Sequence, residues 1–481
     1  MINYAFLLTL EQVERVHDAS LEILENVGLL VRNEKARSIF NKHGCKVDSE
    51  TLIVKFPRAV VEKYRAMLQP TFTFRGRDPK YDRTIPQDEP VIITGSSAPN
   101  IIDPITGQER RARSDDIARI AHLINELTAI DVFSVSTLAD DAPEGQFTLA
   151  RLYPALKYCV KPTRINTKDM NDIRTIMNLL YVIAGSEEAY REHPFVTLHY
   201  CPVVSPLTMD KLSTEGIIYF SEKGLPVYPT IVPNAGLTSP MSMAGTFVQG
   251  NAEFLAAAVL MQMVREGTPT IYASLPTVAD MRSGAYASGG IECGILHMAF
   301  AQMARFYKVP CGGYVGLTNS KINDAQSGYE TGMSSVAGVL AGMDMLNMAG
   351  LLDALKVFNF AKAVIDDEIA QMLKRVKRGI TFNEDELALD VIRQTKPGGS
   401  FLMSPHTAKR MKTEALLTKI ADRDQRNIWE KKGSLDAQAH AMQRANEILA
   451  KSSSSIFPPE VEARIRTEFP ALVPGVLEMP K

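Results

Sequence analysis

Small polar and aromatic residues follow several apolar, β-branched segments in the middle of the chain. Tyr200, Asn234, Tyr314, Thr318 and Asn347 are examples, each at or just after the end of such a segment. Carboxylates and histidines are scarce at these points, so the groups that general acid–base catalysis requires are not evident. We therefore nominate no side chain as a catalytic acid or base.

A site that is polar but poor in acids and bases suits a reaction with little proton transfer. Methyl transfer from a quaternary ammonium is such a reaction, because the leaving group is a neutral tertiary amine that needs no general acid. The protein must hold the substrate in line with a strong nucleophile. It must also accommodate a buried cation, which an aromatic face attracts by about 1–2 kcal/mol when desolvated.

Aromatic residues near predicted strand ends are candidates for contact with that cation: Tyr200, Tyr228, Tyr314 and Phe358. For each of them, filling the core is the alternative interpretation. A substrate carboxylate would suit the free N–H groups at the start of a helix. Such a start is predicted at Ser239-Pro240, where a serine N-cap precedes a proline.

Lysines and histidines support competing hypotheses. A lyase or aldolase on the same fold would use a Schiff-base lysine, for which Lys168 and Lys321 are the candidates. Their polar neighbourhoods would not depress a lysine pKa, so a solvated or structural role is favoured. His297 lies in an apolar helical segment and is expected to pack in the core, and we interpret His199 and His406 with the same caution.

The cysteines do not suggest a metal site. The chain has five, they are scattered, and the sequence contains neither a CxxC pair nor an HExxH motif. We therefore expect no metal site and no disulfide framework.

The elements that would position these residues alternate between short strands and helices. The predicted strands are Val91–Thr94, Asp131–Ser136, Thr163–Asn166, Phe195–Tyr200, Val227–Val232, Thr270–Ser274, Gly312–Val315 and Asp344–Met348. A helical pattern follows each strand, and eight such strand–helix units are the number that a TIM (β/α)8 barrel contains. A doubly wound sheet is disfavoured, because no phosphate-binding glycine fingerprint follows the first strand.

Composition changes at both ends of this region. We predict an N-terminal α+β cap over residues 1–85, a barrel over residues 86–362, and a C-terminal helical extension and tail over residues 363–481. The cap is expected to contain helices at Leu10–Asn26 and Asn33–His43. The extension contains charged helical segments, among them Thr407–Asp422, and a serine-rich joint at residues 451–455.

Composition and charge exclude some classes of partner. The 481 residues are 45% hydrophobic and 22% charged, with a formal net charge of −2 and no basic run, which argues against nucleic acid. No run of 18 uncharged apolar residues occurs, so no membrane span is expected. The first residues lack a basic leader and a cleavage site, and we expect a cytoplasmic protein.

Several long motifs resemble, in order, segments of the trimethylamine methyltransferase family. They are His17–Asp48, Ile101–Leu123, Cys201–Leu207, Ser239–Ser274, Gly312–Thr331 and Gly398–Arg423. The resemblance covers nearly the whole chain and implies a barrel enzyme. Such an enzyme passes a methyl group to the cob(I)alamin of a separate corrinoid protein and holds no tightly bound cofactor itself. A homo-oligomer is also implied.

One departure from the family pattern narrows the expected substrate. Members that act on trimethylamine carry pyrrolysine in the segment resembling Gly313–Lys321, whereas the corresponding position here is Leu317. Members without pyrrolysine are similar to demethylases of quaternary amines. The resemblance therefore implies a betaine substrate, with glycine betaine favoured over proline betaine or carnitine.

These inferences give each candidate residue an expected role. Phe358 and Tyr314 would face the ammonium, with Tyr200 as a further contact. The polar residues Asn234, Thr318 and Asn347 would orient the rest of the substrate. Leu317 would leave space where pyrrolysine would otherwise protrude. The alternatives are a sensor that binds betaines without turning them over, and the lysine-dependent lyase or aldolase.

Overall fold

A closed barrel of parallel strands forms the centre of the molecule. The computed structural model describes residues 4–451 and 457–472. Within these residues eight strands pair with their neighbours in chain order: β6 (Val91–Thr94), β9 (Phe133–Ser134), β10 (Thr163–Ile165), β11 (Val196–Tyr200), β14 (Val227–Ile231), β16 (Tyr272–Ser274), β19 (Cys311–Gly313) and β20 (Met345–Ala349). All pairs are parallel, and a bridge between Ile93 and Val132 closes the ring. The predicted TIM barrel is confirmed.

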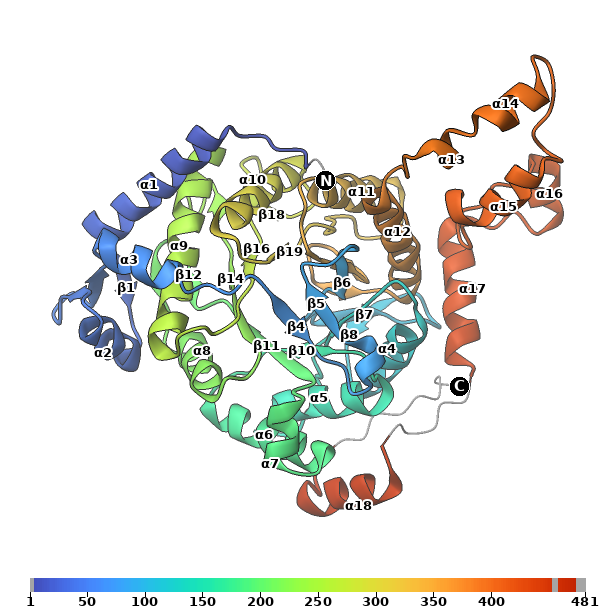
Figure 1. Ribbon diagram of the computed structural model, residues 1–481. Helices are drawn as coiled ribbons and strands as arrows, with labels where there is room; N and C mark the ends of the chain where they lie inside the picture. Colours follow the sequence, from blue (N-terminus) through green and yellow to red (C-terminus); the bar gives the residue numbers. More distant parts are fainter. Residues whose placement is uncertain (1–3, 452–456, 473–481) are drawn as a thin grey trace.

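A helix follows each barrel strand and covers its outer face (Figure 1). The helices are α4 (Ser114–Glu126), α5 (Phe147–Tyr158), α6 (Met170–Ala184), α8 (Leu212–Lys223), α9 (Met243–Val264), α10 (Ile291–Tyr307), α11 (Ala325–Leu340) and α12 (Phe360–Arg378). Helix α9 is long and apolar enough to cross a membrane, but 89% of its most apolar window is buried inside the molecule. It is a core helix packed between the barrel and the cap.

The start of α9 differs from its prediction. The helix begins at Met243, and Ser242 is the N-cap, whose side chain accepts a hydrogen bond from the Gly245 amide at 3.3 Å. The prediction of a start at Ser239-Pro240 is wrong. The Asn234 carbonyl accepts the amides of residues 237, 238 and 239, so this stretch is a tight turn instead.

A hairpin closes the N-terminal end of the barrel. It consists of β4 (Phe72–Phe74) and β5 (Arg83–Ile85), which cross the barrel opening in Figure 1. Its buried rings Phe72 and Phe74 belong to one apolar cluster with Val91 and Met345, the first residues of β6 and β20. Access to the barrel interior is therefore from the opposite end, where the strands finish.

The first 85 residues contact the barrel through a shared sheet. Helices α1 (Leu10–Asn26) and α2 (Glu34–Lys42) agree with the prediction to within a few residues, and a third helix, α3 (Arg58–Arg65), follows them. Strands β1 (Leu29–Val31), β2 (Lys46–Val47) and β3 (Ile53–Lys55) form a sheet with β12 (Val203–Val204) and β13 (Thr208–Met209). Since β12 and β13 lie in the loop after β11, the cap is joined to the barrel by backbone pairing.

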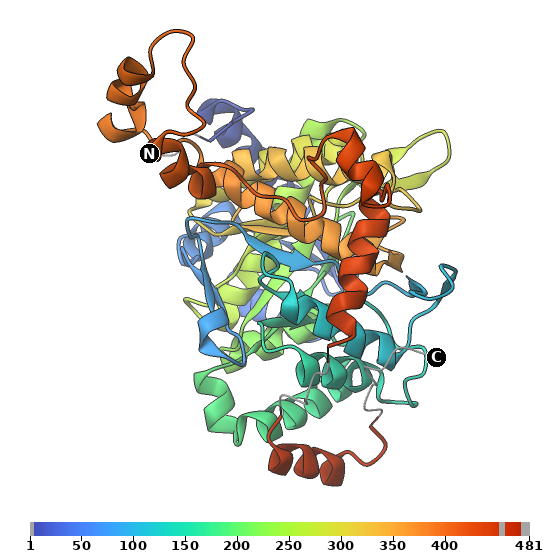
Figure 2. The ribbon, with the colours of Figure 1, turned by 90° about the vertical axis from the view of Figure 1, so that its right-hand side faces the viewer.

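The C-terminal helices leave the barrel and return to it. They are α13 (Glu384–Leu387), α14 (Leu389–Thr395), α15 (Pro405–Glu414), α16 (Arg426–Lys431), α17 (Ala437–Leu449) and α18 (Pro459–Glu468). Figures 1 and 2 show α13 to α16 extending away from the barrel and α17 lying along it. The predicted helix Thr407–Asp422 ends at Glu414. Of the predicted joint at 451–455, residues 452–455 lie outside the described residues. The division at residues 85 and 362 stays a prediction.

Candidate functional site

A buried arginine lies at the centre of the barrel interior. Arg164 is the middle residue of β10 and is fully buried. Its Nε donates to Ser134 Oγ at 2.9 Å on β9. Its two terminal nitrogens donate to the hydroxyls of Tyr228 at 2.8 Å and Tyr314 at 2.9 Å. Parallel strands place these side chains together because residues of one register face the same interior.

Asn347 of β20 completes the ring around the guanidinium. With its amide oxygen toward Arg164, Asn347 accepts hydrogen bonds from both terminal nitrogens, at 2.6 and 3.1 Å. All the N–H groups of Arg164 thus meet neutral oxygens. Among the described residues no ion pair involves Arg164, so its positive charge is buried without a carboxylate partner. Such a charge favours an anionic group of a ligand nearby.

The two tyrosine hydroxyls are prepared to donate hydrogen bonds. Arg164 donates to both phenol oxygens, which leaves the proton of each hydroxyl available for another acceptor. Burial raises the pKa of Tyr228 to about 12, so that hydroxyl stays protonated at neutral pH. Tyr314 also lies 3.3 Å from Ser96 Oγ, at the end of β6.

His199 of β11 and Cys201, the residue that follows this strand, line the same interior. Burial, reinforced by the charge of Arg164, lowers the pKa of His199 well below its ordinary value, so the imidazole is neutral. Its buried Nδ1 has no hydrogen-bond partner within residues 4–451 and 457–472, and its ring lies 6.1 Å from that of Tyr228. Cys201 is solvent-accessible, yet burial raises its pKa to about 11. Both properties fit a side chain that lines a deep recess.

A second buried arginine lies beside the strand ends. Arg151 of α5 donates from Nε to the Thr137 carbonyl at 3.1 Å and from a terminal nitrogen to Ser97 Oγ at 3.1 Å. Its guanidinium lies 5.4 Å from the centre of the Phe147 ring. Burial lowers its pKa to about 10, which still leaves it protonated at neutral pH. The strand-end face therefore carries a second positive charge.

An apolar collar surrounds the mouth of the barrel. Its buried members are Leu275, Tyr314 and Leu317, and Val232, Tyr286 and Leu355 pack against them. These residues come from loops after β14, β16, β19 and β20 and from β18 (Ala285–Ala287). Leu317 is only 1% exposed, so it fills the collar with hydrocarbon.

Among the residues proposed from the sequence, Tyr314, Asn234 and Leu317 lie at this mouth, and Asn347 lies in the barrel interior. Tyr314 and Asn347 meet at Arg164, and Leu317 joins Tyr314 in the collar. Asn234 forms part of β15 (Asn234–Ala235), and its buried Oδ1 has no hydrogen-bond partner among the residues that the structure describes.

The Thr318 hydroxyl already has a hydrogen-bond partner within the protein. It donates to Glu330 Oε2 at 2.6 Å, and the same oxygen accepts the Asn319 amide at 2.8 Å. Glu330 therefore clamps the loop after β19. It is a carboxylate near the mouth that the sequence did not reveal, and its oxygens are already engaged.

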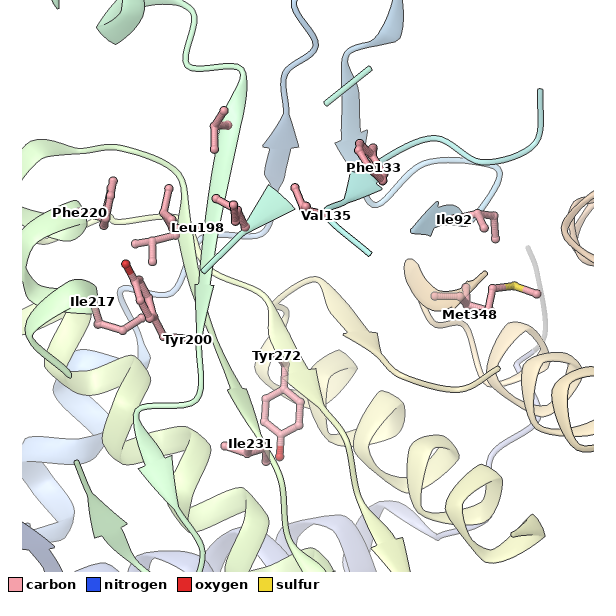
Figure 3. Packing of buried hydrophobic residues seen from close by; sticks show 14 of the residues in the cluster. Ile92, Phe133, Val135, Leu198, Tyr200, Ile217, Phe220, Ile231, Tyr272 and Met348 are labelled. Carbon is pink, nitrogen blue, oxygen red and sulfur yellow. The ribbon is translucent and has the colours of Figure 1, made fainter. Parts of the chain in front are cut away.

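The structure places Tyr200 and Phe358 away from the barrel interior. Tyr200 points outward against Ile217 and Phe220 of α8 (Figure 3), with its hydroxyl 2.6 Å from Thr167 Oγ1. Phe358 lies on β22 (Val357–Phe358), in a small sheet beside β7 (Asn100–Ile102), and its ring packs edge-on against Phe360. For both residues, the core-filling alternative describes their position.

Sequence reasoning missed Arg164, Arg151 and Cys201 and left His199 without a role. One signal was present, because an arginine inside an otherwise buried strand requires polar partners. The two lysines are surface residues: Lys168 and Lys321 are exposed, and Lys321 pairs with Asp353 at 3.3 Å. His297 packs in the core as predicted, with Nε2 3.1 Å from the Tyr314 carbonyl. Within residues 4–451 and 457–472, no group of three potential metal ligands occurs.

Comparison with known proteins identifies similar sequences over nearly the whole chain. The family model described as trimethylamine methyltransferase (MTTB) matches residues 2–471. A glycine betaine methyltransferase of Desulfitobacterium hafniense (strain Y51) is 33% identical, covering 96% of this chain and 95% of the relative. A trimethylamine methyltransferase MttB of Methanosarcina thermophila is 30% identical, covering 92% of both chains.

Solved structures of similar architecture are more distant in sequence. The monomethylamine methyltransferase MtmB of Methanosarcina barkeri aligns over 91% of both chains with a TM-score of 0.49 and 12% identity.

Proposed function

Because the chain belongs to the trimethylamine methyltransferase family, and is thus a methyltransferase, we propose that it demethylates a quaternary amine of the betaine class. The acceptor would be the cob(I)alamin of a separate corrinoid protein, which supplies the nucleophile when it docks at the mouth. Glycine betaine is the favoured substrate, and proline betaine and carnitine are the alternatives.

The observation that carries this proposal is the unpaired charge of Arg164 in the barrel interior. A carboxylate placed in the recess would be attracted by this guanidinium and, beyond it, by Arg151. The hydroxyls of Tyr228 and Tyr314 would donate to that carboxylate, strengthened by the hydrogen bonds they accept from Arg164. Quaternary amines that lack a carboxylate would gain neither interaction.

The same charge determines which way the substrate points. An ammonium beside Arg164 would be repelled, so the trimethylammonium group belongs at the outer end of the recess. There the collar offers aromatic faces at Tyr314 and Tyr286 and hydrocarbon at Leu317. In this orientation an N–CH3 bond faces the opening, where the corrinoid must approach in line with it.

Bond making and breaking then require no proton. The N–CH3 bond would break with its electron pair staying on nitrogen, and the nucleophilic acceptor would supply the electron pair of the new bond to the methyl carbon. The tertiary amine product is neutral at the moment it forms. Neutral His199 and protonated Tyr228 position the substrate without acting as acids or bases.

Of the alternatives, the lyase or aldolase is disfavoured because Lys168 and Lys321 are exposed and Lys321 is paired with Asp353. A non-catalytic sensor would use the same recess and differs only in turnover. The test therefore measures both binding and transfer.

The experiment is an anaerobic assay with reduced cobalamin or a corrinoid protein, followed by absorbance as methylcobalamin forms. The panel contains glycine betaine, proline betaine, carnitine, choline and trimethylamine. We expect activity with a carboxylated member and little with choline, which matches glycine betaine except for the carboxylate. Equal rates with choline and glycine betaine would refute the role of Arg164. Binding of a betaine without transfer to either acceptor would identify a sensor.

A further inference from the structure

A carboxylate of α11 holds the loop that carries Leu317. Glu330 Oε2 accepts the Thr318 hydroxyl at 2.6 Å and the Asn319 amide at 2.8 Å, both in the loop after β19. Its Oε1 accepts a hydrogen bond from Gln326 Nε2 at 3.0 Å, one turn earlier on the same helix. Both oxygens of Glu330 are therefore engaged, and its side chain is fixed against this loop.

Asn319 extends this contact to β18. Its Oδ1 accepts the Gly289 amide at 2.8 Å, and its Nδ2 donates to the Tyr286 carbonyl at 2.8 Å. A continuous set of hydrogen bonds thus runs from α11 through the loop after β19 to β18 and the residues that follow it. We call this set the clamp, and its members are Glu330, Thr318, Asn319, Gly289 and Tyr286.

The clamp leaves no room for a side chain at position 289. A Cβ on Gly289 would stand 2.3 Å from Glu330 Oε2 and 3.1 Å from the Asn319 amide nitrogen. The first of these separations is far below van der Waals contact, so any larger residue would displace the carboxylate. The close approach of the Gly289 backbone is thus a second feature, besides the hydrogen bonds, that fixes Glu330 in place.

We propose that Glu330 is a positioning residue, which sets the places of Leu317 and Tyr286 around the substrate ammonium without touching the substrate. This inference rests on the function proposed above, in which the trimethylammonium group lies in the collar. Leu317 directly precedes Thr318 in the chain, and Asn319 holds Tyr286 by its carbonyl. The clamp therefore acts on the backbone of both collar residues, and the collar widens when the carboxylate is lost.

A wider collar weakens methyl transfer in two ways. The N–CH3 bond must lie in line with the acceptor, and a displacement of about 1 Å costs up to about 100-fold in rate. The ammonium also loses contact with the ring face of Tyr286. The hydrogen bonds of Arg164 to Tyr228 and Tyr314 lie outside the clamp, so the carboxylate end of the recess is retained.

Limited proteolysis of the full-length protein tests the clamp without substrate. The side chains of Arg282, in the turn before β18, and Lys321, in the loop after β19, are 91% and 72% exposed and are sites for trypsin. Glu330→Ala should speed cleavage at both sites at least about tenfold, the value of one hydrogen bond to a charged group, because these segments open more easily. Gly289→Ala should act in the same direction, since its methyl group displaces the carboxylate.

Two further variants are matched controls. Glu330→Gln keeps an oxygen that can accept both hydrogen bonds of the loop, so its cleavage and kinetics should be closer to wild type than to Glu330→Ala. Gly328→Ala adds a methyl group two residues away on α11, where a Cβ has no close neighbour, and it should change neither measurement.

Anaerobic kinetics and calorimetric titration test the positioning role, with free cobalamin and the betaine that the wild type demethylates fastest. Glu330→Ala should raise KM and the dissociation constant for the betaine about tenfold and lower kcat about tenfold, with KM for cobalamin unchanged. A purely structural role would neither separate the two KM values nor be rescued by Glu330→Gln.

Three results would contradict the inference, each in a different way. Unchanged tryptic cleavage of Glu330→Ala would overturn the clamp. Faster cleavage with unchanged kcat, KM and dissociation constant for the betaine would leave the clamp in place and overturn the positioning role. A wild type that neither binds nor demethylates any betaine would overturn the proposed function, and this inference with it.

Discussion

The guanidinium of Arg164 connects four strands of the barrel. Its partners Ser134, Tyr228, Tyr314 and Asn347 lie on or directly after β9, β14, β19 and β20. A charge in this position costs desolvation free energy that hydrogen bonds to neutral oxygens only partly offset. At the scale of single residues, the interior is therefore organised to receive an anion.

Removing the Tyr314 hydroxyl tests this arrangement. Tyr314→Phe keeps the aromatic ring and deletes only the donor, so KM for the betaine should rise about 10- to 150-fold, the value of a hydrogen bond to a charged group. Tyr200→Phe is the matched control, because that hydroxyl bonds Thr167 outside the barrel interior. Steady-state kinetics check both variants. A similar rise in both would contradict the assigned positions.

His297 makes stability depend on pH. Burial lowers its pKa to about 4, whereas an imidazole in the unfolded chain titrates near 6.5. The unfolded state therefore binds more protons between these values. The stabilisation that comes from neutral His297 should be complete above about pH 6.5. Below that pH the free energy of unfolding should fall, by about 3 kcal/mol toward pH 4.

Denaturant titrations of wild type and His297→Gln across this range check the prediction. Glutamine can still donate to the Tyr314 carbonyl but does not titrate. The variant should show a flatter pH dependence, with the residual slope arising from other buried groups such as His199. Identical slopes would rule out His297 as the source.

At the scale of elements, the two ends of the barrel have separate tasks. The β4–β5 hairpin closes the N-terminal end, while the loops after the strands form the mouth. Ile85→Ala, at the end of β5, would leave a cavity under the barrel and should lower the free energy of unfolding by about 2–5 kcal/mol. At a temperature where the variant is folded, KM for substrate should be unchanged, because the recess opens at the other end. A raised KM would show that the ends are coupled.

At the scale of the whole molecule, the proposed function requires that the mouth also receive a corrinoid protein. The turn after β15 and the hairpin β17 (Thr277–Asp280)–β18 expose Met241 53% and Met281 61% on its rim. Both sulfurs lie within 3.0 Å of where a Cβ on Gly236 would stand. Methionine is enriched in protein interfaces, and its flexible side chain adapts to a partner surface.

We expect Met281→Glu to raise KM for the corrinoid protein at least about tenfold while leaving KM for the betaine unchanged. Titration of each substrate separately resolves the two effects. Free cobalamin needs no protein docking, so its rate should be unaffected. A change with free cobalamin would place Met281 in the substrate recess instead of a docking surface.

The sequence alone determined the order and types of elements, because these depend on local patterns. The Thr9–Gln12 capping box starts α1 where it was predicted, and the β-branched runs gave the barrel strands in order. The predicted start of α9 was wrong because the Asn234 carbonyl accepts hydrogen bonds from three backbone amides and forms a turn there. No local sequence pattern indicated this turn.

Only the tertiary structure decided which side chains share the recess. Whether a strand residue faces inward depends on its register with neighbouring strands. In the observed register, His199 faces inward and its neighbour Tyr200 faces outward. The role proposed for Arg164 depends on hydroxyl oxygens that are far from it in the sequence and that the fold brings to its guanidinium. Local sequence preferences determine helices and strands, because they act between residues close in the chain. The electrostatic potential at a site is instead a sum over charged and polar groups that only folding brings together.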